Sequence, residues 1–156
     1  MDVVLNWKGR MSFEGVSETG FVQKMDAEEA AGGQNGAARP MEFIAIGLAG
    51  CTGMDVISIL QKKKQPVTDF QVQVHAPRSE DHPKVFSSAV IEYRVSGRDV
   101  DETALLRAIE LSAEKYCPAQ AMLGKAFPMQ LIYKIFDDDG TTLIKQGEYI
   151  AKQIAS

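Results

Sequence analysis

Two cysteines are the residues of this chain whose type and spacing could carry chemistry. Cys51 lies in a long apolar segment, and Cys117 is followed directly by Pro118. A thiolate attacks electrophiles, and a second thiol can then close a disulfide. The pair therefore predicts a redox reaction in which one cysteine is oxidised and the other resolves it. The alternative is that both are small apolar residues of the core, where a buried thiol is unreactive.

A reactive Cys51 needs a cation or a hydrogen-bond donor near its sulfur. Arg39 and Arg10 are the candidates, because both stand in or beside predicted loops. Glu42 precedes Cys51 by nine residues on one predicted helix, which corresponds to about 13 Å of helical rise, so the two side chains are not expected to touch along a straight helix. Glu42 could equally serve only the positive end of the helix dipole.

The segment that carries Cys51 has the pattern of a long helix. Pro40 suits its first turn, the lysines at 62–64 suit its last turn, and Pro66 follows. Since the segment is apolar on nearly every side, it is expected to be buried on nearly every side, in the core or in a dimer. Three glycines, Gly47, Gly50 and Gly53, predict close packing of other backbone against it.

The remaining pattern predicts an α+β fold in a single domain over residues 1–156. Strands are expected at 3–8, 11–16, 21–25, 67–75, 85–95 and 129–136, and residues 26–38 read as an exposed loop. Residues 99–102 resemble a capping box led by Asp99, after which Leu105, Ile109 and Tyr116 recur at helical spacing. Cys117 would end that helix, with a short helical turn over 119–124.

Composition excludes several classes of function. The chain has 156 residues, 45% hydrophobic and 24% charged, with a net charge of −4, which offers no basic surface for nucleic acid. The N-terminus has no signal-peptide pattern, and we do not expect any apolar stretch to span a membrane. The protein is therefore expected to be cytoplasmic, with reduced thiols and without a membrane partner. His75 and His82 have no close ligand spacing, so no metal is expected.

The chain resembles the OsmC/Ohr family of osmotically inducible and organic hydroperoxide resistance proteins. The resemblance rests on Arg39-Pro40-Met41-Glu42, on Gly47-Leu48-Ala49-Gly50-Cys51-Thr52, and on Tyr116-Cys117-Pro118 sixty-six residues after Cys51. It implies an OsmC-like fold, with antiparallel sheets around a long buried central helix. It also implies an intertwined homodimer with its active sites at the subunit interface.

The same resemblance implies a thiol-dependent peroxidase that reduces organic hydroperoxides without a cofactor. Cys51 would be the peroxidatic cysteine and Cys117 the resolving cysteine, with an external dithiol as reductant. Glu42 and Arg39 would complete the site, although family peroxidases carry the glutamate directly after the proline, where this chain has Met41. The alternatives are a non-catalytic OsmC-like protein that binds a small ligand, or a redox sensor.

Overall fold

The structure is a computed structural model that describes residues 1–150, and it contains two compact units. The first comprises residues 1–45 and the second begins at residue 46. The long helix α1, Pro40–Lys62, starts in the first unit and continues into the second, with the bounds that the sequence predicted. The single domain over 1–156 stays a prediction.

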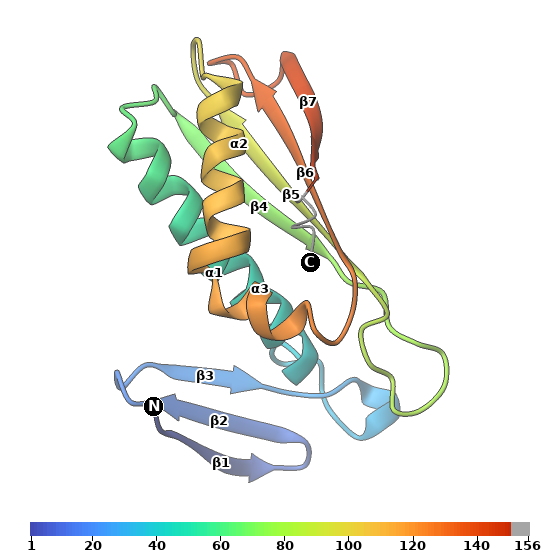
Figure 1. Ribbon diagram of the computed structural model, residues 1–156. Coiled ribbons are helices and arrows are strands. Elements are labelled where there is room, and N and C mark those ends of the chain that lie inside the picture. The colour runs from blue at the N-terminus through green and yellow to red at the C-terminus, as the bar shows by residue number, and fades with distance from the viewer. Residues whose placement is uncertain (151–156) are drawn as a thin grey trace. The chain divides into compact units, whose positions relative to one another are not determined.

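The first unit contains a three-stranded antiparallel sheet in the order β1-β2-β3 (Figure 1). Its strands are β1 Val3–Gly9, β2 Ser12–Ser17 and β3 Val22–Met25. The tight turn after β1 places Gly9 at φ 104° and Arg10 at φ 48°, a region that glycine enters without strain. The predicted meander is confirmed, with each strand within a residue or so of its expected bounds.

The segment after β3 is a loop, as predicted, but it is organised around a buried side chain. The carboxylate of Asp26, only 6% exposed, accepts the backbone N–H groups of Ala27, Gln34 and Gly36 at 2.8, 3.1 and 2.9 Å. The Gly36 hydrogen bond contributes most to holding the pKa of Asp26 below its usual value. A short 3₁₀ helix, η1 Glu29–Ala31, lies inside this loop. The prediction of an exposed loop was therefore wrong for Asp26 and also for Gly33, which is buried.

The second unit is built on a four-stranded sheet in the order β4-β5-β6-β7. The strands are β4 Asp69–His75, β5 Ala89–Ser96, β6 Met129–Phe136 and β7 Leu143–Tyr149. The β5–β6 pair is parallel and the other two pairs are antiparallel. This sheet is therefore mixed where an antiparallel one was expected, because helices connect β5 to β6. The strands predicted at 67–75 and 85–95 are confirmed as β4 and β5, although β5 begins four residues later than predicted, and the bounds of β6 are confirmed. Strand β7 was not predicted, because its sequence reads as a polar tail.

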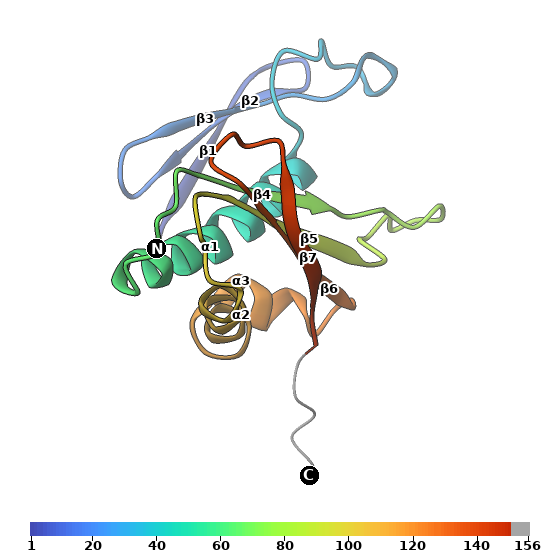
Figure 2. The same ribbon diagram turned by 90° about the horizontal axis from the view of Figure 1, so that it is seen from above.

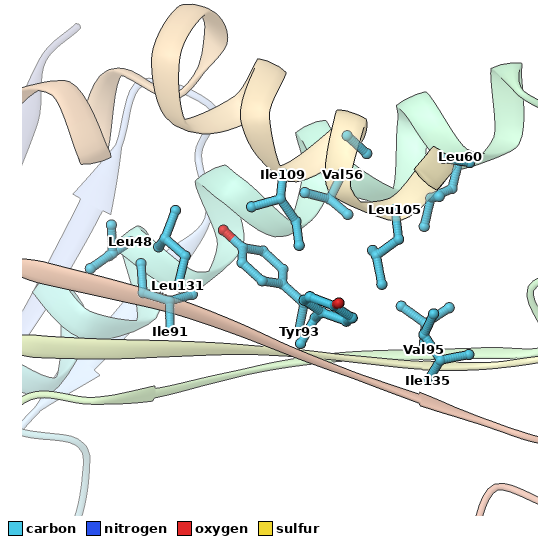
Figure 3. Packing of buried hydrophobic residues seen from close by; sticks show 13 residues of the cluster. Leu48, Val56, Leu60, Ile91, Tyr93, Val95, Leu105, Ile109, Leu131 and Ile135 are labelled. Atoms are coloured by element: carbon cyan, nitrogen blue, oxygen red, sulfur yellow. The ribbon is translucent and has the colours of Figure 1, made fainter. Parts of the chain in front are cut away.

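Two helices cover one face of this sheet, α1 and α2 Glu102–Leu111 (Figures 1 and 2). Strand β5 alternates buried and half-buried side chains, as expected of a strand with one face against the helices. Figure 3 shows Leu105 and Ile109 of α2 opposite Tyr93 and Val95 of β5. This layer is the hydrophobic core that holds the second unit together.

Within one chain, helix α1 is buried on one face, and its predicted burial on nearly every side stays a prediction. Leu48, Val56 and Leu60 are buried, whereas Ile46 and Met54 are 58% and 75% exposed. An added Cβ at Gly53 would come within 3.3 Å of a Val72 methyl, so a side chain, and not the predicted backbone, packs closely there. Open space surrounds the corresponding position at the other two, 47 and 50, within this chain, so close packing against them stays a prediction.

The length and composition of α1 would also allow it to cross a membrane, contrary to the expectation from the sequence. A core helix of a soluble protein has the same length and composition, and the buried face of α1 packs into the core of the second unit. Packing against the sheet accounts for the buried face of α1, while 28% of its most apolar window is buried within this chain.

The N-cap of helix α2 lies two residues later than predicted. Asp101, not Asp99, is the N-cap, and its side chain accepts the N–H of Thr103 at 2.9 Å. Asp99 has φ 60° and lies in the preceding turn. Leu105 and Ile109 are fully buried as predicted, but Tyr116 is 49% exposed, because a π-helical turn, η2 Ser112–Tyr116, rotates the end of the helix.

Replacing Leu105 by alanine should lower the free energy of unfolding by about 2–5 kcal/mol, because a fully buried leucine leaves both lost contacts and a cavity. The same substitution at Leu143, which is 45% exposed, should cost less than about 1 kcal/mol. Urea unfolding of both variants compares the two losses. Equal losses would contradict the placement of Leu105 at the centre of the core.

Candidate active site

The two cysteines meet in the second unit. Cys51 is a half-buried free thiol on α1, and Cys117 is a free thiol only 2% exposed. Their side chains are close enough to hydrogen-bond to each other. Residues sixty-six positions apart are thus adjacent in the fold.

The backbone around Cys117 explains why its sulfur is held in this place. The N–H of Cys117 donates to the Ser112 carbonyl at 2.9 Å and so closes the π-helical turn. Pro118 then opens the short helix α3, Pro118–Leu123, with Cys117 as its N-cap. The sulfur takes the usual place of a capping oxygen and accepts the N–H of Gln120 at 3.4 Å.

A network of buried polar side chains lies beside the two thiols. The hydroxyl of Thr52 is 2.6 Å from that of Tyr93 and 2.9 Å from that of Ser112. Gln120 donates its amide N–H to Thr52 at 2.8 Å, and Ser112 donates to the Asp55 carboxylate at 3.0 Å. Burial raises the pKa of Tyr93 to about 12, so this phenol stays neutral and keeps its hydrogen to donate.

Arg39 and Glu42 form a contact of their own in the first unit. The Glu42 carboxylate accepts the backbone N–H of Arg39 at 2.8 Å, which is the contact that the third helical residue makes in a capping box. The Arg39 guanidinium lies 3.8 Å from Glu42 and 3.6 Å from Glu28. Both side chains of this pair are about half exposed. A catalytic role for either residue stays a prediction.

Arg10, the other predicted cation, also belongs to the first unit. It stands in the turn between β1 and β2, where its carbonyl accepts the indole N–H of Trp7 at 2.8 Å. Its charge contributes, as the smallest of several causes, to the lowered pKa of Asp26. Within this unit, then, Arg10 supports the turn and the loop.

Comparison with known proteins fits this arrangement of cysteines on a long helix and a helix end. Residues 33–132, which include both cysteines, match the family described as OsmC-like protein. The chain belongs to the OsmC-like family. It is 36% identical over 135 residues to Protein YhfA of Escherichia coli K12, covering 86% of this chain and 98% of that protein.

Solved structures support the OsmC-like, α+β fold. A hypothetical protein from Aquifex aeolicus VF5 matches with a TM-score of 0.76 and 29% identity, over 87% of this chain and 96% of that one. An organic hydroperoxide resistance protein OsmC from Legionella pneumophila matches with a TM-score of 0.63 over 86% of this chain and 96% of that one. At 14% identity the second likeness shows the fold alone.

Sequence reasoning found the two cysteines of this OsmC-like chain but missed the polar network beside them. A signal existed, because Thr52 directly follows Cys51 and Gln120 lies three residues after Cys117. Side chains at such positions in apolar helices need buried partners. Which partners they find depends on Tyr93 and Ser112, which come from other elements of the fold.

The buried thiol of this OsmC-like chain should be alkylated slowly at neutral pH and faster as the pH rises. Burial, with a smaller contribution from Cys51, raises the pKa of Cys117 to about 11, against the opposing effect of the Gln120 N–H. Because only the thiolate is alkylated, labelling of Cys117 by iodoacetamide should accelerate about tenfold per pH unit until it levels off near pH 11. Peptide mass spectrometry measures this. In the unfolded chain the plateau should fall near the ordinary value of 9.0, and a folded plateau there would contradict the assignment.

Proposed function

We propose that this OsmC-like chain is a thiol-dependent peroxidase that reduces organic hydroperoxides. The observation that carries the proposal is the contact between two free thiols of unequal exposure, half-buried Cys51 and buried Cys117. An incoming peroxide meets the more accessible sulfur first, so Cys51 is assigned the peroxidatic role and Cys117 the resolving role. The Legionella protein of the same fold is named for organic hydroperoxide resistance.

The proposed reaction has two steps on the protein. The Cys51 thiolate attacks the terminal peroxide oxygen, so that an S–O bond forms, the O–O bond breaks, and the alkoxide leaves and becomes the alcohol after taking a proton. The Cys117 thiolate then attacks the Cys51 sulfur, forming the disulfide and releasing hydroxide, which becomes water. An external dithiol exchanges with the disulfide and restores both thiols. None of these steps requires a metal or another cofactor.

We further propose that a second copy of the chain covers the exposed face of α1. A groove of about 430 Å³ runs along this face of the second unit. It is lined by apolar side chains and by two of the helix glycines, including Ile46, Gly50, Met54 and Phe70. A contiguous apolar surface of this kind is typical of a protein–protein interface. A homodimer would also bury the apolar sides of α1 that remain exposed in one chain.

The alternative function is binding of a small apolar ligand without turnover. The same groove favours it, because apolar pockets with few polar groups suit such ligands. The two functions differ in what happens to the thiols, since a binding protein has no need to oxidise them.

Intact-mass analysis after mixing the reduced protein with an equimolar amount of cumene hydroperoxide, and separately of hydrogen peroxide, tests the proposal. A peroxidase should lose two hydrogens rapidly, yield a Cys51–Cys117 peptide, turn over with dithiothreitol and react faster with the organic peroxide. Native mass spectra of the same samples report the number of subunits. Thiols that remain unchanged would contradict the peroxidase and favour the binding protein.

A further inference from the structure

Gln120 connects the two cysteine-bearing segments. Its backbone N–H donates to the sulfur of Cys117 at 3.4 Å. Its side-chain amide N–H donates to the Thr52 hydroxyl at 2.8 Å and approaches that of Tyr93 at 3.4 Å. Thr52 is the residue after Cys51, so one buried side chain ties the start of α3 to the helix turn that carries the other thiol.

The hydrogens of the network can be assigned one by one. Ser112 uses its single hydroxyl hydrogen on the Asp55 carboxylate, so the Ser112 oxygen must accept from Thr52. Thr52 has then used its own hydrogen, and Tyr93 must donate to it. The direction of donation is therefore fixed, from Tyr93 through Thr52 and Ser112 to Asp55.

This direction also fixes the side chain of Gln120. Neither Thr52 nor Tyr93 has a hydrogen left for an amide oxygen, so the amide nitrogen of Gln120 must face them. All members except Asp55 are buried, and water does not offer them replacement partners. The network thus admits one arrangement, in which the first turn of α3 is fastened to α1 at Thr52.

We propose that Gln120 is a positioning residue for closure of the Cys51–Cys117 disulfide. Its side chain, held by Thr52 and Tyr93, keeps the first turn of α3 where the Cys117 sulfur faces Cys51. Where peroxide is the oxidant that leads to closure, this inference rests on the proposed function. The Gln120 side chain acts through its neighbours and does not itself take part in a bond that forms or breaks.

The step that Gln120 would assist is the attack of the Cys117 thiolate on an oxidised Cys51. With a sulfenic acid, an electron pair of Cys117 forms the S–S bond while the S–O bond breaks and hydroxide leaves. Diamide provides the same closure without peroxide. The Cys51 thiolate adds to the N=N bond of diamide and forms an S–N bond. Cys117 then attacks the Cys51 sulfur, so that the S–S bond forms, the S–N bond breaks and the reduced hydrazine leaves. In both cases the rate depends on the distance and angle between two sulfurs.

The test compares the rates of the two steps in Gln120→Met, which keeps the length of the side chain but loses the amide. Closure with diamide, and with cumene hydroperoxide after Cys51 is oxidised, should slow roughly 10- to 100-fold, as expected for a small misplacement of reacting atoms. The rate at which Cys51 itself is oxidised, followed with a sulfenic acid trap, should change less than about twofold. In that step Cys51 reacts with the peroxide, and the polar network does not take part. A residue with only a structural role would lower the melting temperature without this split between steps.

Thr52→Val provides a second variant that removes the shared acceptor. It should slow closure to a similar extent, and the double variant should be no slower than either one, because both changes break the same contact. Tyr133→Phe is the matched control. Tyr133 pairs with Tyr93 across β5 and β6 and is also buried, but its hydroxyl donates to Glu102, away from the network. Its loss should leave closure unchanged.

Closure at the wild-type rate in folded Gln120→Met, or in Thr52→Val if the first variant does not fold, would overturn the inference. The diamide arm separates this result from failure of the proposed function. If the wild-type protein does not react with peroxide but forms the disulfide with diamide, and Gln120→Met forms it slowly, the positioning role stands and the peroxidase does not. If peroxide oxidises both proteins and both close equally fast, the peroxidase stands and the positioning role does not.

Discussion

Replacing Cys51 by serine should reduce the rate of organic hydroperoxide consumption at least about 10³-fold, to the level of the uncatalysed reaction. Serine keeps the shape of the side chain, but its hydroxyl is a far weaker nucleophile than a thiolate, and it cannot form a sulfenic acid that a thiol resolves. Because Cys51 is only half-buried, the polar replacement should alter stability by less than about 1 kcal/mol. Peroxide consumption coupled to dithiothreitol oxidation measures the loss.

Ser58→Ala serves as the control for this result, because it removes a single atom on the same helix, seven residues after Cys51, at a half-buried position. It should keep wild-type turnover. Peroxidase activity that survives in Cys51→Ser would show that the reaction does not begin at this sulfur. The contact between the two thiols would then need another explanation, such as a sensing disulfide without efficient turnover.

The elements that the sequence predicted are those whose signals are local. Pro40 at the start of α1 and Lys62 at its end belong to the helix itself, and the structure has these bounds. The alternating run at Met129–Phe136 was also predicted with its observed limits, since each second residue faces the core. The two cysteines were found because few residue types react as thiols do. Such features need no knowledge of the rest of the fold.

The errors occur where distant contacts decide the structure. Asp101 caps α2 in place of Asp99, and its backbone N–H donates to Gln65, which comes from a segment far along the chain. Strand β7 is polar in sequence and forms because β6 offers it an edge. Tyr116 fits the helical spacing of Leu105 and Ile109, but the π-helical turn moves it to the surface. Local propensity does not contain these partners.

The candidate site combines both kinds of feature. Cys51 and Cys117 could be chosen from the sequence, but their contact depends on the turn that Ser112 closes and on the buried side chains that fasten α3 to α1. The shifted Glu42 also has a local explanation, since at the third helical position its carboxylate caps the N–H of Arg39. Its position therefore does not require a catalytic role.

Replacing Cys117 by serine should separate the two steps that Cys51→Ser removes together. The Cys51 thiol should still be oxidised by one molecule of cumene hydroperoxide, but no disulfide should form, because serine cannot displace the sulfenic oxygen. A sulfenic acid without a resolving thiol proceeds to sulfinic and sulfonic acids in excess peroxide, so the variant should be inactivated progressively during turnover. Intact mass, with and without a sulfenic acid trap, distinguishes these products.

A Cys117→Ser protein that turns over as long as the wild type would show that the external dithiol reduces Cys51 directly. In that case the buried thiol would be a packing residue beside a one-cysteine centre, as its raised pKa alone would also allow.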